Sequence, residues 1–187
     1  MSAVDTLPMM SMPAYVHCRP GETISHRRPG DFILVRDKNW LGLLIRCLVR
    51  IRYRTRADRP YTYWSHAALV VSSAGHMVEV NPRGVVISHI RLYRDRDYHY
   101  VSLDLPDAER AAAVRFARSC LGHKYSVRNF LLLAAIGALG DRIPMPDSGD
   151  GCASLVARAL QEAGIRFDRK PTEMTPADLA KRFGVTP

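Results

Sequence analysis

The sequence lacks the features that mark several classes of protein. Its longest apolar run, residues 130–139, has ten residues, about half of what a membrane-spanning helix needs. There is no glycine-rich phosphate loop, no internal repeat and no group of histidines at metal-ligand spacing. The four cysteines, Cys18, Cys47, Cys120 and Cys152, match neither a zinc pattern nor a small disulfide framework. These absences argue against a spanning helix and a metal site, and they predict no cofactor.

The composition is that of an ordinary globular protein. The chain has 187 residues, of which 47% are hydrophobic and 24% are charged. A chain of this size can bury a hydrophobic core large enough to be stable without a disulfide or a bound metal. The net charge is +9 and is unevenly distributed, because residues 36–59 hold eight basic and two acidic residues. Such a basic segment attracts nucleic acid, anionic lipid or acidic protein without selecting among them.

The first 28 residues differ from the rest of the chain. They are interrupted by proline and have neither the basic start nor the apolar block of a secretory signal. We therefore expect an irregular leader over residues 1–28 and a single domain over residues 29–187. We also expect a cytoplasmic protein with reduced thiols, peripheral to a membrane at most. The sequence does not indicate an oligomeric state.

Hydrophobic patterning predicts strands first and helices mostly afterwards. The strands are expected over residues 29–36, 65–71, 76–81, 85–90 and 98–103, and the helices over 39–54, 106–121, 129–139, 152–164 and from 175 onward. Thr175 and Pro176 give the last helix a cap and a first-turn proline. This order favours an α+β fold over a doubly wound parallel sheet.

The helix expected over residues 39–54 is both apolar and basic. Asn39 is a plausible N-cap, and the apolar positions Leu41, Leu44, Ile45 and Leu48 follow at helical spacing. One interpretation packs these residues on the core and leaves the arginines in water. The other docks the helix on a membrane, with the arginines meeting anionic headgroups. The arginines concerned are Arg46, Arg50, Arg52 and Arg54. Nucleic acid is not expected, because no nucleic-acid-binding module surrounds them.

Cys152 is the most informative single residue. It directly follows the turn-like residues 147–151 and opens the helix over 152–164. A thiol at a helix N-terminus meets the positive end of the helix dipole and unpaired amide groups, which favour a thiolate and provide an oxyanion site. The alternative is a small buried apolar residue that happens to begin a helix.

His66 and Glu79 are the other two candidates. His66 begins an otherwise apolar strand, and Glu79 lies inside another, where a carboxylate is unfavourable unless it is paired or exposed. Each has a plain structural alternative: a histidine satisfied by the backbone, and a glutamate facing solvent. Together with Cys152 they supply a nucleophile, a base and a residue that orients the base.

The motifs that carry these residues occur in an informative order. GDFILVR, WSHAALVV, MVEVNPRGVV, GHKYS and DGCASLVARAL follow one another over residues 30–160. The series resembles the permuted branch of the NlpC family of papain-like cysteine hydrolases, which includes the YiiX-like proteins and is related to the lecithin retinol acyltransferase group. In that branch the histidine strand precedes the cysteine helix, as it does here.

The resemblance implies a fold and a set of roles. The fold would be a circularly permuted papain-like one, with a small antiparallel sheet packed against helices that include the nucleophile helix. Cys152 would be the nucleophile, His66 the base and Glu79 the third polar residue. His76 is a rival to Glu79 because some relatives use a second histidine in that strand; we favour Glu79, since a carboxylate better stabilises an imidazolium. Tyr125 would contribute to the oxyanion site.

The expected activity is that of a cysteine hydrolase or acyltransferase acting on an amide or ester bond through a covalent acyl-enzyme. The basic helix favours a lipid or acyl substrate. A cell-wall peptide amidase or endopeptidase of the same family is the first alternative. A catalytically inactive module that binds a membrane or a protein partner is the second.

Overall fold

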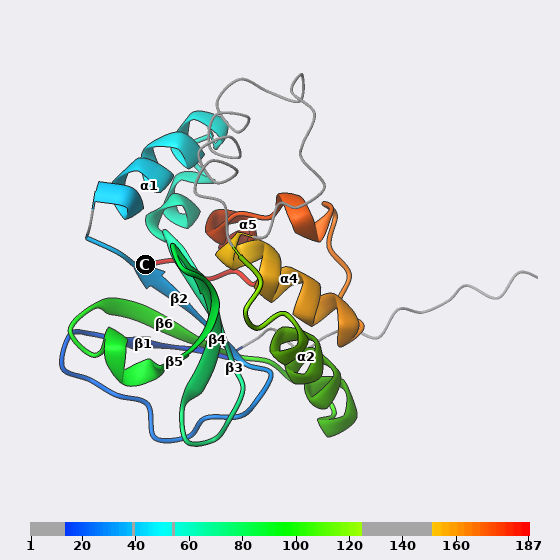
Figure 1. Ribbon diagram of the computed structural model, residues 1–187. Coiled ribbons are helices and arrows are strands. Elements are labelled where there is room, and N and C mark those ends of the chain that lie inside the picture. The colour runs from blue at the N-terminus through cyan, green and yellow to red at the C-terminus, as the bar shows by residue number, and fades with distance from the viewer. Residues whose placement is uncertain (1–13, 39, 54, 125–150) are drawn as a thin grey trace, which may run out of the picture.

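The computed structural model describes residues 14–38, 40–53, 55–124 and 151–187 (Figure 1). Its centre is a six-stranded antiparallel sheet in the order β1-β6-β2-β3-β4-β5. The strands are β1 (Ala14–Cys18), β2 (Phe32–Arg36), β3 (His66–Val70), β4 (His76–Asn81), β5 (Gly84–His89) and β6 (Asp97–Ser102). The sheet and its accompanying helices confirm the predicted α+β class.

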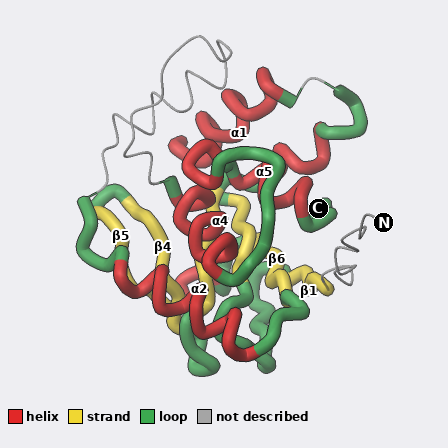
Figure 2. The backbone as a smooth tube through the Cα atoms, turned by 90° about the vertical axis from the view of Figure 1, so that its right-hand side faces the viewer, coloured by secondary structure: helices red, strands yellow, loops and turns green. Residues whose placement is uncertain are grey.

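The bounds of the helices are α1 (Trp40–Arg52), α2 (Asp107–Ser119), α4 (Cys152–Glu162) and α5 (Pro176–Arg182), and those of the 3-10 turns are η1 (Arg59–Tyr63), η2 (Ile90–Tyr93) and η3 (Pro171–Glu173). The helices α2, α4 and α5 lie on one side of the sheet, α1 lies beyond its end, and the 3-10 turn η2 packs on the opposite face (Figures 1 and 2). α4 packs against α2 and against β3 and β4. No helix within the described ranges is long and apolar enough to cross a membrane.

Alternation along the strands gives the sheet two apolar faces. Leu69 and Val78 point into the main core, which also contains the buried side of α4, whereas Val70 and Met77 point into a second core on the opposite face. In α4 the side chains of Leu155 and Leu160 are at most 1% exposed. Burial of each such side chain is worth about 1.5–3 kcal/mol. α4 is therefore held firmly against the sheet, and so is the residue at its N-terminus.

One predicted boundary is wrong. The sequence predicts an irregular leader over residues 1–28, whereas Ala14–Cys18 form β1, which pairs with β6 along its whole length. Four of these five residues are exposed, so no alternation of burial marks the strand in the sequence. The paired residues lie 80 to 88 positions apart in the chain, and only the tertiary fold brings them together. Residues 1–13, Asn39 and the helix expected over 129–139 lie outside the described residues.

The last helix begins as the sequence predicts. The Thr175 hydroxyl accepts from the Asp178 amide, and the Asp178 carboxylate accepts from the Thr175 amide at 2.8 Å, with Pro176 at the first helical position. Reciprocal capping of this kind satisfies two of the amides that a helix leaves unpaired at its start. α5 is thereby anchored beside η1, which it contacts.

Candidate active site

Cys152 is the first residue of α4 and is half-buried. The N-cap residue is Gly151, which has no side chain to bond the first-turn amides of the helix. Those amides and the positive end of the helix dipole therefore face the region around the thiol. An anion that forms next to Cys152 would be stabilised by both.

His66 and Glu79 form a direct hydrogen-bonded pair. Nε2 of His66 lies 2.7 Å from Oε2 of Glu79, and the two side chains are only 12% and 7% exposed. The sheet register explains the contact. Because Leu69 pairs with Val78, positions 66 and 79 fall on the same face of adjacent strands, on a diagonal. Glu79 is thus a buried, paired carboxylate rather than one that faces solvent.

The thiol of Cys152 reaches the same imidazole. It interacts with His66 both as a hydrogen-bond partner and as a charge. Since Glu79 occupies Nε2 of His66, Nδ1 is the ring nitrogen left for the sulfur. The structure therefore brings together the three residues that the sequence singled out, in the order thiol, imidazole and carboxylate.

The charges within this trio shift the pKa values of two members. Burial lowers the pKa of His66, but the negative charges and hydrogen bonds of Cys152 and Glu79 outweigh it and hold the value well above 6.5. Burial raises the pKa of Glu79, but the hydrogen bonds from His66 and Tyr93 bring it down to about 2. The imidazolium and the carboxylate accordingly stabilise each other as ions near neutral pH.

Tyr93 is a fourth member that the sequence analysis missed. Its hydroxyl donates to Oε2 of Glu79, and its ring stacks on that of His66 with the centroids 5.9 Å apart. Burial and the neighbouring Glu79 raise the pKa of Tyr93, so it stays protonated and remains a donor. Tyr93 ends η2, between two strands, where neither periodicity nor a motif marks it.

His76 lies away from this trio. It is exposed at the first position of β4, and its Nδ1 lies 3.0 Å from the Ser72 hydroxyl. Its carbonyl accepts from the amide of Val71, at the end of the hairpin opposite to His66. The structure thus pairs Glu79, and not His76, with the candidate base. Tyr125, expected near the oxyanion, lies outside the described residues.

The basic helix α1 buries part of the predicted apolar face and one further residue. Ile45 and Val49 form its buried side, in a small cluster with Ala177 of α5. Leu44 is half-buried. Val49 was not among the four residues expected on this face, and the side chains of the other two, Leu41 and Leu48, lie outside the description.

The four arginines of interest are only partly described. Arg46 donates to the carbonyl of Asp37 at 2.6 Å, and burial together with the nearby Arg36 lowers its pKa. Arg50 is exposed. The side chain of Arg52 and all of Arg54 lie outside the described residues. Arg46 therefore helps to fix the start of α1, whereas Arg50 is free to meet another molecule.

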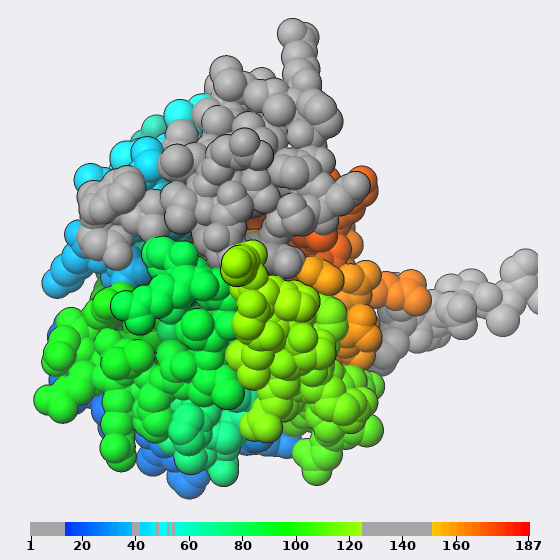
Figure 3. Space-filling view, viewed as in Figure 1, coloured from blue at the N-terminus to red at the C-terminus, as the bar shows by residue number. Residues whose placement is uncertain are grey.

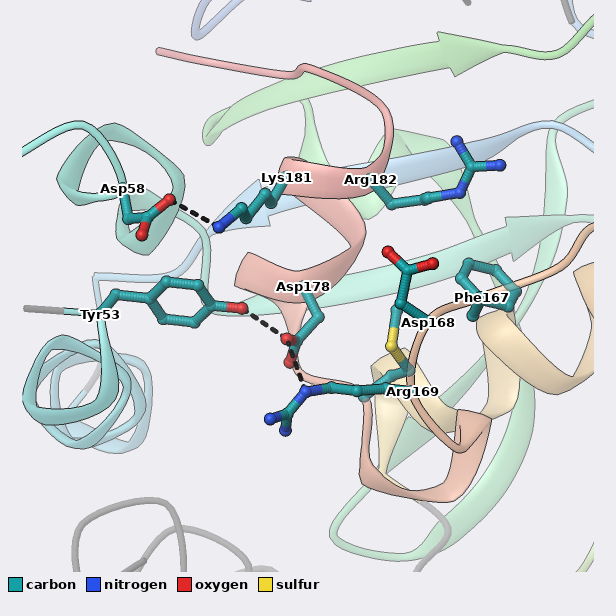
Figure 4. A pocket seen from close by; sticks show the side chains of 9 residues that line it. Tyr53, Asp58, Phe167, Asp168, Arg169, Asp178, Lys181 and Arg182 are labelled. Carbon is teal, nitrogen blue, oxygen red and sulfur yellow. Dashed lines mark hydrogen bonds and ion pairs between the residues drawn. The ribbon is translucent and has the colours of Figure 1, made fainter. Parts of the chain in front are cut away.

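A pocket of about 590 Å³ opens beside α5 (Figure 4). Lys181 bonds Asp58 across it at 2.8 Å, and Tyr53 donates to Asp178. Its remaining lining residues are Phe167, Asp168, Arg169, Met174 and Arg182. Acidic and basic side chains are equal in number here, so the pocket has no preferred ligand charge. None of the trio lines it.

No group of three metal-ligating side chains occurs in the part of the chain that the structure describes. The trio itself offers one thiol, one imidazole already bonded to a carboxylate, and no further ligand. Such a set is suited to covalent chemistry.

No protein-family model matches the chain, and no curated protein matches it.

Proposed function

We propose that this protein is a cysteine hydrolase or acyltransferase that acts on amide or ester bonds through a covalent acyl-enzyme. The observation that supports the proposal most strongly is the half-buried His66, held between the Glu79 carboxylate at 2.7 Å and the Cys152 thiol. A nucleophile at a helix N-terminus, a base in contact with it and an orienting acid are the parts that acyl transfer needs.

The reaction would start from the ion pair of thiolate and imidazolium. The Cys152 sulfur attacks the substrate carbonyl carbon, and the carbonyl oxygen becomes an oxyanion that the first-turn amides of α4 stabilise. His66 gives its proton to the leaving amine or alkoxide as the bond to it breaks, which leaves a thioester on Cys152. Glu79 and Tyr93 keep the imidazole oriented through this proton transfer.

The second half regenerates the enzyme. Neutral His66 removes a proton from water, and the resulting hydroxide attacks the thioester carbonyl. The carbon–sulfur bond breaks, the carboxylic acid leaves, and the thiolate and imidazolium are restored. In an acyltransferase an alcohol or amine takes the place of water and becomes the new ester or amide.

The proposed fold is the circularly permuted papain-like one. In support, β3 with His66 precedes α4 with Cys152 in the chain, and α4 packs on β3 and β4. For the substrate, we favour a lipid or other acyl compound because of the basic α1, ahead of a cell-wall peptide. The contrasting possibility is a module that binds a partner without catalysis.

The relative rates of cysteine alkylation distinguish a cysteine enzyme from a non-catalytic binding module. Cys47 is exposed and Cys152 only half-buried, while Cys18 and Cys120 are buried. Exposure alone would make Cys47 react first. If His66 activates the thiol, iodoacetamide at pH 6 modifies Cys152 at least about tenfold faster than Cys47, as peptide mass spectrometry would measure.

Two variants serve as test and control. His66→Ala should remove the advantage of Cys152, whereas His76→Ala, in the neighbouring strand and outside the trio, should keep it. A Cys152 that reacts no faster than Cys47 in the unmodified protein would contradict the enzyme proposal and favour the binding module.

A further inference from the structure

The helix α1 has a second apolar face, which points to solvent. Leu43 is 54% exposed and Ile51 is 42% exposed, and Cys47 between them is exposed as well. The three residues follow one another at steps of four, so they form one stripe along the helix. The buried residues Ile45 and Val49 lie on the other side, against α5. We call the residues Leu43, Cys47 and Ile51 the outer stripe.

The outer stripe is accompanied by positive charge. Arg50 is exposed next to Ile51, and Lys38, Arg56 and Arg59 are exposed just before and just after the helix. The segment 36–59 carries eight basic and two acidic residues. Of the two acidic residues, Asp37 is paired with Arg96 and Asp58 with Lys181, so neither offsets the exposed cations of this segment.

We propose that the outer stripe binds the surface of an anionic lipid bilayer. Helices that lie in the plane of a membrane interface combine an apolar stripe, buried at the level of the headgroups, with basic residues that attract anionic lipids. Nucleic acid would engage the arginines but leave Leu43 and Ile51 in water. The space-filling view shows part of α1 (cyan) at the edge of the molecule (Figure 3).

The position of α1 links this surface to the candidate site. β2 ends at Arg36, four residues before α1 begins, and its Val35 pairs with His66. α1 therefore lies at the end of the sheet where β3 starts (Figure 1). Membrane binding through the outer stripe does not depend on the proposed reaction, but it would bring that end of the sheet close to lipid substrates.

The test is co-sedimentation of the full chain with vesicles. The probes are vesicles of phosphatidylcholine alone and vesicles of phosphatidylcholine with one quarter phosphatidylserine, in about 0.1 M salt. We expect binding to the phosphatidylserine vesicles, little binding to phosphatidylcholine alone, and loss of binding at high salt. The variant Leu43→Ser/Ile51→Ser keeps the charge and should bind at least about tenfold more weakly.

The matched control is Ile87→Ser/Leu92→Ser, which removes two apolar side chains that are 53% and 65% exposed outside α1. It should bind as the unmodified protein does. Cys152→Ala should also bind normally, so that failure of the reaction and failure of docking are told apart. Equal binding by the stripe variant and the unmodified protein would overturn the proposal.

Two further results would also overturn it. A lower melting temperature of Leu43→Ser/Ile51→Ser would show that the outer stripe packs within the protein. Self-association without vesicles, detected by light scattering and lost in that variant, would show that a second copy of the chain is the occupant.

Discussion

Two histidines on the same sheet, one half-buried and one buried, have opposite surroundings. His66 in β3 lies between a carboxylate and a thiol, whereas His99 in β6 lies among the rings of Tyr15, His17 and Trp64, at centroid distances of 5.2, 4.4 and 4.6 Å. His99 is 1% exposed, and neither of its ring nitrogens has a hydrogen-bond partner among the described residues.

The pKa values of the two imidazoles shift in opposite directions. Burial lowers the pKa of His99 to about 4, with the help of the nearby His17 and against the attraction of Asp97. For His66 the charges of Cys152 and Glu79 outweigh burial and raise the pKa well above 6.5. Burial is common to both, so the presence of a bonded anion decides whether a buried histidine can carry a proton. His66 is suited to acid–base chemistry, and His99 fills space as a neutral ring.

The largest expected effect comes from removing the carboxylate charge beside His66, so that His66, like His99, has no carboxylate bonded to it. Glu79→Gln removes the negative charge beside His66 and should lower the acyl-transfer rate by roughly 10²- to 10⁴-fold, because the imidazolium is no longer stabilised. The check is kcat/KM for an activated ester, with His76→Ala as the control that should leave the rate unchanged. A Glu79→Gln protein with full activity would remove Glu79 from the proposed mechanism.

The second prediction concerns stability at acid pH. The folded pKa of His99, about 4, lies below its ordinary value of 6.5. The neutral ring therefore stabilises the fold fully above pH 6.5, and this contribution is lost as the pH falls from 6.5 toward 4 and below. The loss amounts to about 3 kcal/mol in the free energy of unfolding.

The variant His99→Phe tests this contribution. Urea unfolding between pH 7 and pH 4 should show a smaller loss of stability for His99→Phe than for the unmodified chain. His26→Phe, at an exposed position, is the control and should behave as the unmodified chain does. The same pH dependence in all three proteins would mean that His99 is not the group responsible.

The smallest expected effect is that of Tyr93→Phe. The substitution keeps the ring on His66 but removes the hydroxyl that donates to Glu79. The pKa of Glu79 should then rise from about 2 toward its ordinary 4.5, because a hydrogen bond to the charged form is lost. The acid limb of the pH–rate profile should move to higher pH, whereas the rate near neutrality should change little because Glu79 is still ionised there.

Tyr15→Phe provides the comparison, since Tyr15 is 40% exposed and stacks on His99 rather than on His66. Its pH–rate profile should match that of the unmodified protein. An unshifted acid limb in Tyr93→Phe, measured alongside it, would show that Tyr93 fills space beside Glu79 without tuning its charge.

The sequence by itself determined what depends on neighbours along the chain. Short apolar runs between polar residues mark β3 and β4, the Thr175, Pro176 and Asp178 pattern begins α5, and Cys152 directly follows a glycine at the start of a periodic helix. Each of these patterns involves residues only a few positions apart in the sequence. At that range the spacing alone determines which side chains lie on the same face.

The tertiary structure decided what depends on contacts between segments. It alone pairs β1 with β6, selects Glu79 over His76, adds Tyr93 to Glu79, and determines which side of α1 faces α5. These contacts join residues that strand register and helix packing bring together. A shift of one residue in register would turn His66 or Glu79 to the other face of the sheet. No local sequence pattern specifies the strand register, because the register depends on how the whole core packs.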